Sequence, residues 1–216
     1  MNVPIYNMNK AEGILGGTFD PIHCGHLAVA DFVAKQCSLA KIHFIPCLEP
    51  PHRFKPQASA AHRLEMVKLA TAGHPQWIAN DIDYHRPAPS FMIDTLRILR
   101  EQQPDTPWCL ILGMDAFNSF NQWRDWRNIL SFCHLIVVNR PGFAVPKEPW
   151  AQELLSQTII NNPQQLITSL YGQLLLLEMP PSDISATQIR NQLNQLENTV
   201  PAKVLNYIQK HALYNN

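Results

Sequence analysis

The sequence predicts an α/β protein with a Rossmann-like, doubly wound parallel sheet and a small C-terminal helical extension. Short apolar segments alternate with segments whose apolar residues recur at helical spacing. Three of the short segments, residues 108–112, 134–138 and 174–177, are almost continuously apolar, as expected of parallel strands buried on both faces. The pair Gly16-Gly17 stands where a first strand ends and a helix begins, a junction at which α/β proteins hold phosphates.

The remaining predicted elements continue this alternation of strands and helices. Pro46 stops the second strand, the prolines within residues 50–56 predict a loop, and Pro201 is expected to open the last helix. Residues 141–173 show the weakest secondary-structure pattern, and within them we expect a helix near 151–157 and an irregular connection. In chain order we expect strands at 13–15, 42–45, 77–83, 108–112, 134–138 and 174–177, helices at 27–34, 61–72 and 93–99, and a last helix with an apolar stripe of Val204, Leu205, Ile208 and Ala212.

Length and composition predict a single domain over residues 1–216, with a core over about 11–182 and a helical part over about 183–216. Basic and acidic residues each number 17, so the chain lacks the basic excess of a nucleic-acid-binding protein. No apolar run approaches the length of a membrane span, and the N-terminal residues lack a signal-peptide pattern. The five cysteines form no C-x-x-C pair, so we expect a reduced, cytoplasmic location.

The most informative stretch, G-G-T-F-D-P-I-H-C-G-H, runs from Gly16 to His26. Its two histidines, His23 and His26, would add side-chain donors to the free N–H groups at the helix start, so the stretch predicts a phosphate site. A metal-binding pair is an alternative, since residues three apart share a helix face, but the sequence places no third ligand nearby. Each histidine alone could be structural. Together, after a Gly-Gly strand end, they favour phosphate without a protein-bound metal.

A second candidate site, residues 184–190, follows the last predicted strand. Ser185 and Gln188 have the spacing of a capping box, so a helix is expected to begin here, with Thr187 and Arg190 in its first turn. Arginine donates bidentate hydrogen bonds to phosphate, and this helix start would suit the far end of a polyphosphate. The alternative is an ordinary capped helix with a solvated arginine.

A third candidate site follows the central apolar strand. Gly113 and Asp115 occupy its carboxyl end, where ligands bind in such sheets. Trp123 and Trp126 lie three apart shortly afterwards, on a helix or a turn. Both could belong to the core, which we favour for Trp126, whereas an exposed indole at Trp123 could stack on an aromatic ring.

These motifs resemble the bacterial nicotinate-nucleotide adenylyltransferases, members of the nucleotidyltransferases that share an H-x-G-H signature. The resemblance extends over nearly the whole chain, from Gly13 to about Tyr214. Besides the first stretch, it rests on P-P-H-R at 50–53, S-F-M-I-D-T-L at 90–96, G-M-D at 113–115, W-R-D-W at 123–126 and I-S-A-T-Q-I-R at 184–190.

The resemblance implies that ATP and nicotinate mononucleotide react, with Mg2+, to give deamido-NAD and pyrophosphate in NAD biosynthesis. The 5′-phosphate of the mononucleotide would attack the α-phosphorus of ATP directly, so positioning and charge stabilisation matter more than an enzyme nucleophile. The expected partners are these small molecules, with no nucleic acid and no membrane. The sequence is compatible with a monomer and with a homo-oligomer.

The resemblance also implies roles for individual residues. His23, His26 and Arg190 would be catalytic, Trp123 would stack on the pyridine ring, and backbone N–H groups near Ser90 would meet the nicotinate carboxylate. The implied ATP-binding residues are Gly16, Gly17, Thr18, Phe19, His23, His26, Gly113, Asp115, Ser185, Thr187 and Arg190, and the implied mononucleotide-binding residues are His52, Arg53, Ser90, Phe91, Asp115 and Trp123.

The chain departs from many of these enzymes at three places. Arg53 stands where many have lysine, Ala186 where many have serine, and Phe91-Met92 where many have Tyr-Thr. The phosphate machinery is unaffected, but backbone contacts become more important around the pyridine. Two alternatives stay open: the same chemistry on the amide mononucleotide or another phosphorylated acceptor, and a catalytically silent nucleotide sensor.

Overall fold

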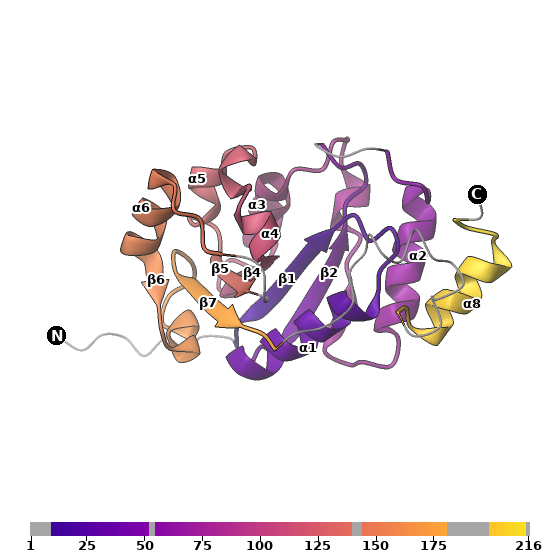
Figure 1. Cartoon of the computed structure of the whole chain (residues 1–216), viewed down its shortest axis with the longest axis horizontal. Helices are drawn as coiled ribbons and strands as arrows, with labels where there is room; N and C mark the ends of the chain where they lie inside the picture. The colour runs from indigo at the N-terminus through magenta and orange to yellow at the C-terminus, as the bar shows by residue number, and fades with distance from the viewer. Residues whose placement is uncertain (1–9, 52–54, 140–143, 181–198, 215–216) are drawn as a thin grey trace.

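The structure of the protein, a computed structural model, describes residues 10–51, 55–139, 144–180 and 199–214. Within them lies one seven-stranded sheet with strand order β3-β2-β1-β4-β5-β7-β6 (Figure 1). Every strand pair is parallel, which confirms the predicted Rossmann-like fold. The strands are β1 (Glu12–Gly17), β2 (Lys41–Pro46), β3 (Trp77–Ala79), β4 (Trp108–Gly113), β5 (His134–Asn139), β6 (Ile159–Ile160) and β7 (Leu174–Glu178).

Helices cover both faces of the sheet (Figure 1). One face is covered by α1 (Cys24–Cys37), α2 (Ala60–Thr71) and α8 (Ala202–Lys210), whose apolar residues share a core with one side of the strands. The other face is covered by α3 (Met92–Gln102), α4 (Met114–Phe117), α5 (Trp126–Ile129) and α6 (Pro149–Thr158). Three short 3-10 helices, η1 (Ile82–His85), η2 (Phe120–Gln122) and η3 (Pro163–Ile167), complete the described elements.

The apolar runs of the sequence become strands buried on both sides. In β4, Cys109 and Ile111 belong to the core under α1 and α2, whereas Leu110 and Leu112 belong to the core under α3 and α4. Successive side chains of a strand point to opposite faces, so a strand between two helical layers must be apolar at every position.

The strand order changes direction between β1 and β4. Backbone pairing joins β1 to β2 as far as Gly17 and Pro46, but joins β1 to β4 only as far as Ile14 and Leu110. The last residues of β1 and β4 are therefore not paired with each other. In an open parallel sheet, ligands bind at this kind of switch point, outside the carboxyl ends of the strands.

Three predicted elements differ from the structure. The strand expected over 77–83 ends at Ala79, and η1 follows it. The described part of segment 141–173 contains α6, β6 and η3. The helix expected near 151–157 is therefore present, as α6, and slightly longer than expected. Ala212 does not belong to the apolar stripe of α8, because the helix ends at Lys210 and Ala212 is exposed.

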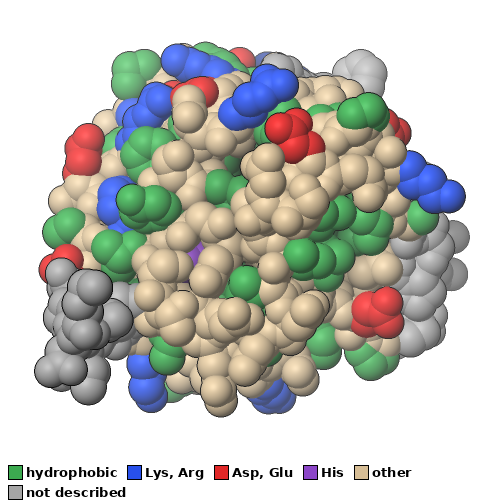
Figure 2. Space-filling model, turned by 90° about the vertical axis from the view of Figure 1, so that its left-hand side faces the viewer, with side chains coloured by type: hydrophobic (Ala, Val, Ile, Leu, Met, Phe, Trp, Pro, Cys, Tyr) green, Lys and Arg blue, Asp and Glu red, His purple; other side chains and the backbone are tan. Residues whose placement is uncertain are grey.

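On the face shown in Figure 2, basic and acidic groups alternate rather than gathering into one basic stripe. None of the helices in the described residues is both long and apolar enough to cross a membrane. All five cysteines are free thiols.

A buried histidine stands at the start of β5. The His134 Nδ1 atom accepts a hydrogen bond from the Gln173 backbone N–H (3.2 Å), so we assign the ring proton to Nε2, which donates to the Ser169 carbonyl (3.1 Å). Burial lowers the pKa of His134 from its usual 6.5 to about 4. The ring is therefore neutral at physiological pH.

This histidine should make stability depend on pH. Between pH 6.5 and about 4 the unfolded chain binds a proton at His134 and the folded chain does not, so the free energy of unfolding should fall as pH falls, by at most about 3 kcal/mol. We expect His134→Asn to reduce this slope in urea titrations at several pH values. An unchanged slope in His134→Asn would contradict the assignment of a buried, neutral ring.

Candidate functional site

The carboxyl end of β1 lies directly against the start of α3. A Cβ atom built on Gly16 would come within 2.5 Å of the Met92 methyl carbon, so the side chain of Met92, the first residue of α3, reaches the end of β1. Phe19, next in the loop, has a left-handed backbone (φ 48°), and its ring packs edge-on against His26 at 5.0 Å. The predicted phosphate-binding loop therefore joins β1, the start of α1 and the start of α3 in one place.

The two histidines of the motif stack on each other at the start of α1. His23 is the N-cap residue and is buried, and its backbone N–H donates to the Nδ1 atom of His26 (3.2 Å). The ring centroids are 3.6 Å apart at an interplanar angle of 30°. With Nδ1 of His26 accepting, the proton of the neutral ring is assigned to Nε2. In the described part of the chain, no three His, Cys, Asp or Glu side chains group as a metal site.

Asp20, in the same loop, ties three distant parts of the chain together. Its carboxylate accepts hydrogen bonds from the backbone N–H groups of Gln57 (2.8 Å) and Ala58 (3.1 Å) and from the Tyr214 hydroxyl (2.7 Å). The loop before α1 is thereby fixed to the segment before α2 and to the residues after α8. Asp20 lies within the Gly16–His26 motif, but its neighbours in the sequence do not predict these contacts.

Arg63, in α2, is a second residue that the sequence analysis missed. Its guanidinium is almost completely buried, and its Nη1 atom donates to the carbonyl oxygens of Thr18 and Cys47 (2.7 Å each). Its Nη2 atom donates to the Leu48 carbonyl (2.9 Å). A signal was present in the sequence, because Arg63 lies on the helical stripe that α2 buries.

Ser90 holds the residues after β2 against the start of α3. Its Oγ atom accepts from the Leu48 backbone N–H (2.9 Å), and its own N–H donates to the Glu49 carbonyl (2.9 Å). The Ser90 N–H is therefore already hydrogen-bonded. Of the backbone N–H groups predicted to bind the nicotinate carboxylate, this leaves those of Phe91 and Met92. At Phe91 and Met92, the backbone N–H groups form no hydrogen bond within the described residues, and Phe91 gives α3 no side-chain cap.

The carboxyl end of β4 presents Gly113 and Asp115. Gly113 is the N-cap residue of α4, and a Cβ atom there would collide with Oδ1 of Asp115, so the carboxylate folds back over the glycine. Asp115 is exposed. Both residues stand across the switch point from Gly16, as predicted for the ligand side of the sheet.

The two tryptophans differ in surroundings. Trp123 follows η2, is half-buried, and contacts Phe120 alone among the described rings (centroids 5.6 Å apart). Trp126 begins α5 and lies between Phe120 (5.9 Å) and Trp150 (5.5 Å). Both indoles are half-buried against the same core, so the two differ in that Trp126 packs against two aromatic side chains and Trp123 against one.

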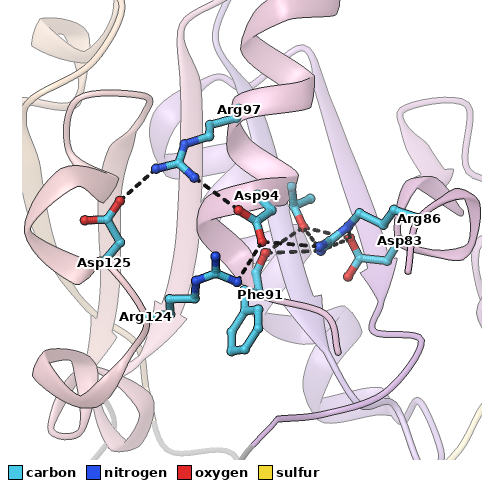
Figure 3. Close-up of polar contacts among 8 residues, drawn as sticks. Asp83, Arg86, Phe91, Asp94, Arg97, Arg124 and Asp125 are labelled. Carbon is cyan, nitrogen blue, oxygen red and sulfur yellow. Dashed lines mark hydrogen bonds and ion pairs between the residues drawn. The ribbon is translucent and has the colours of Figure 1, made fainter. Parts of the chain in front are cut away.

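A cluster of arginines and aspartates surrounds the first turn of α3 (Figure 3). Asp94 pairs with Arg97 (3.1 Å) and Arg124 (3.4 Å), and the Arg124 guanidinium lies 4.6 Å from the centre of the Phe91 ring. Asp83 accepts from Arg86 (2.7 Å). A pocket of about 370 Å³ opens here, lined by Arg86, Pro87, Ala88, Pro89, Phe91, Asp94 and Arg124. The cluster fixes α3 to the loop that carries Trp123.

The C-terminal residues return to the start of α1. The Cys24 backbone N–H donates to the Thr199 carbonyl (2.8 Å), so the first residue described after 198 contacts the histidine turn. Five predicted site residues, His52, Arg53, Ser185, Thr187 and Arg190, lie outside the described residues. Of the others, Gly16 to His26 and Gly113 to Asp115 lie at or just after the carboxyl ends of β1 and β4, Ser90 and Phe91 directly precede α3, and Trp123 follows η2.

The chain is similar to known proteins over nearly its whole length. Residues 14–192 match the model of the family described as cytidylyltransferase-like. A probable nicotinate-nucleotide adenylyltransferase of Coxiella burnetii is 44% identical over 208 residues, which cover 94% of this chain and 97% of the relative. One of Acidithiobacillus ferrooxidans is 39% identical over 207 residues, which cover 94% of this chain and 95% of the relative.

Solved structures share the fold. The nicotinic acid mononucleotide adenylyltransferase of Plasmodium falciparum, complexed with NaAD, superimposes with a TM-score of 0.73 at 18% identity, covering 96% of this chain and 98% of the other. By its sequence, its sheet topology and its full-length similarity to these relatives, the chain belongs to the nicotinate-nucleotide adenylyltransferases of the cytidylyltransferase-like family.

Proposed function

We propose that this enzyme transfers the adenylyl group of ATP to nicotinate mononucleotide, giving deamido-NAD and pyrophosphate in NAD biosynthesis. The observation that carries the proposal is the meeting of the glycine–histidine loop and the uncapped start of α3 at the switch point of the sheet. Both groups suit anions, and the names of the full-length relatives supply the two substrates.

In the proposed reaction, an oxygen of the mononucleotide 5′-phosphate attacks the α-phosphorus of ATP. A new phosphorus–oxygen bond forms, the bond from the α-phosphorus to the bridging oxygen breaks, and pyrophosphate leaves with the electron pair. No group on the enzyme becomes covalently attached. The protein contributes by aligning the two phosphates and stabilising the charge on the oxygens of the transition state.

On the ATP side, His23 and His26 would donate to the phosphates, with Gly16 and Gly17 permitting their close approach. This assignment is supported by the stacked rings at the start of α1, where the helix dipole also favours negative charge. We propose that the β- and γ-phosphates and the leaving pyrophosphate are held by residues outside the described part, namely Ser185, Thr187 and Arg190.

Adenylyl transfer from ATP generally uses a divalent metal ion, and we propose Mg2+. Among the described residues no three ligating side chains group together, so the ion is best regarded as part of the ATP substrate, bound to its phosphates. There it would neutralise part of the phosphate charge. The residues of this chain would then bind the same phosphates through N–H and hydroxyl donors rather than through carboxylates.

On the mononucleotide side, Trp123 would stack on the pyridine ring and Asp115 would accept from a ribose hydroxyl. The nicotinate carboxylate would meet the N–H groups of Phe91 and Met92, which form no hydrogen bond within the described residues. His52 and Arg53, outside the described residues, are proposed to close over the substrate phosphates. We also propose that the enzyme works in the cytoplasm on diffusing small molecules, which its free thiols and dispersed charges support.

The proposed substrate predicts a preference for the acid over the amide. The purified enzyme, with ATP and Mg2+, should release pyrophosphate faster with nicotinate mononucleotide than with nicotinamide mononucleotide, because an anionic carboxylate binds free N–H groups better than a neutral amide does. Faster release with the amide would contradict the substrate. Undetectable release with both would favour a nucleotide sensor instead.

His23→Ala should lower kcat by about 100- to 1,000-fold while the KM for ATP changes little, as expected for a donor that acts mainly in the transition state. Steady-state pyrophosphate release measures both constants, and circular dichroism checks the fold. His85→Ala, at an exposed histidine of η1, is the matched control and should leave both constants unchanged. An effect confined to KM would show that His23 binds ATP equally in the ground and transition states.

Trp123→Ala should raise the KM for nicotinate mononucleotide, because stacking of a planar base on an aromatic side chain contributes about 1–3 kcal/mol. The KM for ATP should stay near the wild-type value. Trp126→Ala, made as the matched variant, should lower the melting temperature without changing either KM, since Trp126 packs between Phe120 and Trp150. Equal mononucleotide affinities in wild type and Trp123→Ala would assign Trp123 to the core.

A further inference from the structure

Arg63 occupies a position where a charged side chain is unexpected. The buried stripe of α2 consists of Arg63, Met66, Val67, Ala70 and Thr71, and the arginine is only 1% exposed. Burying a guanidinium is costly unless its donors are satisfied. Here backbone carbonyl oxygens accept from both terminal nitrogens, whereas Nε forms no hydrogen bond within the described residues. The carbonyls thus offset much of the cost of burial, but they do not explain why the arginine is present.

The carbonyls that Arg63 binds come from two different loops of the candidate site. Thr18 belongs to the glycine–histidine loop after β1, whereas Cys47 and Leu48 directly follow β2. The Nη1 atom donates to Thr18 and Cys47 together, at 2.7 Å each, so one nitrogen joins the two loops. The planar, forked guanidinium can do this with fixed angles, whereas a lysine ammonium has one nitrogen on a flexible chain.

The same two loops are bound by further polar groups. Leu48 also donates its N–H to Ser90, which places the start of α3 against the loop after β2. Thr18 is next to Phe19, whose ring contacts His26. If the Arg63 guanidinium moved, the two loops would move with it. The shift would change the position of the histidine turn proposed to bind phosphate and the position of the uncapped start of α3.

Arg63 forms no ion pair with any carboxylate of the described residues, because each described ion pair involves other basic groups. Burial raises the pKa values of the Cys47 thiol and the Tyr84 hydroxyl, and the positive charge of Arg63 opposes both shifts. A buried positive charge without a paired carboxylate therefore lies beneath the loop proposed to bind phosphates.

We propose that Arg63 is a positioning residue for adenylyl transfer, which holds the loop after β1 and the loop after β2 in one relative geometry so that the two substrate phosphates align. This inference rests on the proposed function. It assigns to Arg63 no contact with substrate. Its effect passes through the Thr18, Cys47 and Leu48 carbonyls to the groups that bind ATP and the mononucleotide.

The primary test is Arg63→Lys, which keeps the charge but removes the fork. We expect kcat to fall by about 100-fold, the size of effect that a misplacement of about 1 Å can have, while the KM for ATP changes little. Arg63→Met, which loses charge and fork, should lower kcat at least as far and also weaken ATP binding. If Arg63→Met does not fold, Arg63→Lys still decides the question.

Arg100 provides a matched control. It is an arginine of α3 whose guanidinium likewise donates to backbone carbonyls, those of Pro104, Thr106, Phe132 and Leu170, at the opposite edge of the sheet. Arg100→Lys should lower the melting temperature and leave kcat unchanged. If Arg63→Lys behaves in the same way, with lower stability and wild-type kcat, Arg63 is structural only and the proposal is wrong.

Amide hydrogen exchange separates this inference from the proposed reaction. In Arg63→Lys, and not in Arg100→Lys, exchange should become faster in peptides containing residues 17–19 and 47–48. If wild type releases no pyrophosphate, the reaction proposal fails, and faster loop exchange in Arg63→Lys but not in Arg100→Lys still supports the positioning of the two loops. Wild-type loop exchange in Arg63→Lys would overturn it in either case.

Discussion

Strands β1 and β4 share backbone hydrogen bonds only as far as Ile14 and Leu110, and the candidate site depends on this early separation. The helices that follow these strands cover opposite faces of the sheet, so the chain leaves the sheet in two directions from neighbouring strands. The loops and helix starts that follow β1 and β4 therefore lie on opposite faces but at the same edge of the sheet, where the carboxyl ends of the strands are. The close approach of Met92 to Gly16 bridges the same place. A ligand at this edge can contact α1, α3 and the end of β4 together.

The loops at this edge are held mainly by polar side chains that bind backbone groups. Asp20 accepts from two N–H groups before α2, Arg63 donates to carbonyls of two loops, and Ser90 joins the residues after β2 to α3. Such bonds set the relative positions of the loops, and the N–H groups of Phe91 and Met92 form no hydrogen bond within the described residues. This is the arrangement that a reaction driven by alignment needs, because two phosphates must meet in line while no protein atom becomes covalently attached.

The protein has no net charge, yet its site suits two anionic substrates, and local structure explains how. The start of α3 offers uncapped N–H groups, and the start of α1 carries two histidines. The buried Arg63 lies against the loop that joins β1 to α1. The aspartates around α3 are neutralised by Arg86, Arg97 and Arg124 (Figure 3). At the proposed site, attraction for phosphate would therefore arise from oriented donors at one edge rather than from a basic surface.

The sequence by itself determined the parallel sheet, the central strands and the glycine–histidine junction, because these depend on local patterns: continuous apolar runs, and glycines between a strand and a helix. The elements within residues 77–83 and 141–173 were predicted less accurately. Each segment combines a short strand with helical turns, and pairing with neighbouring strands decides where such a short strand forms. Only the tertiary structure showed what Asp20, Arg63 and Ser90 do. Their partners lie far away along the chain, 37 residues for Asp20 and Gln57 and 45 for Arg63 and Thr18, and no local pattern encodes such a contact.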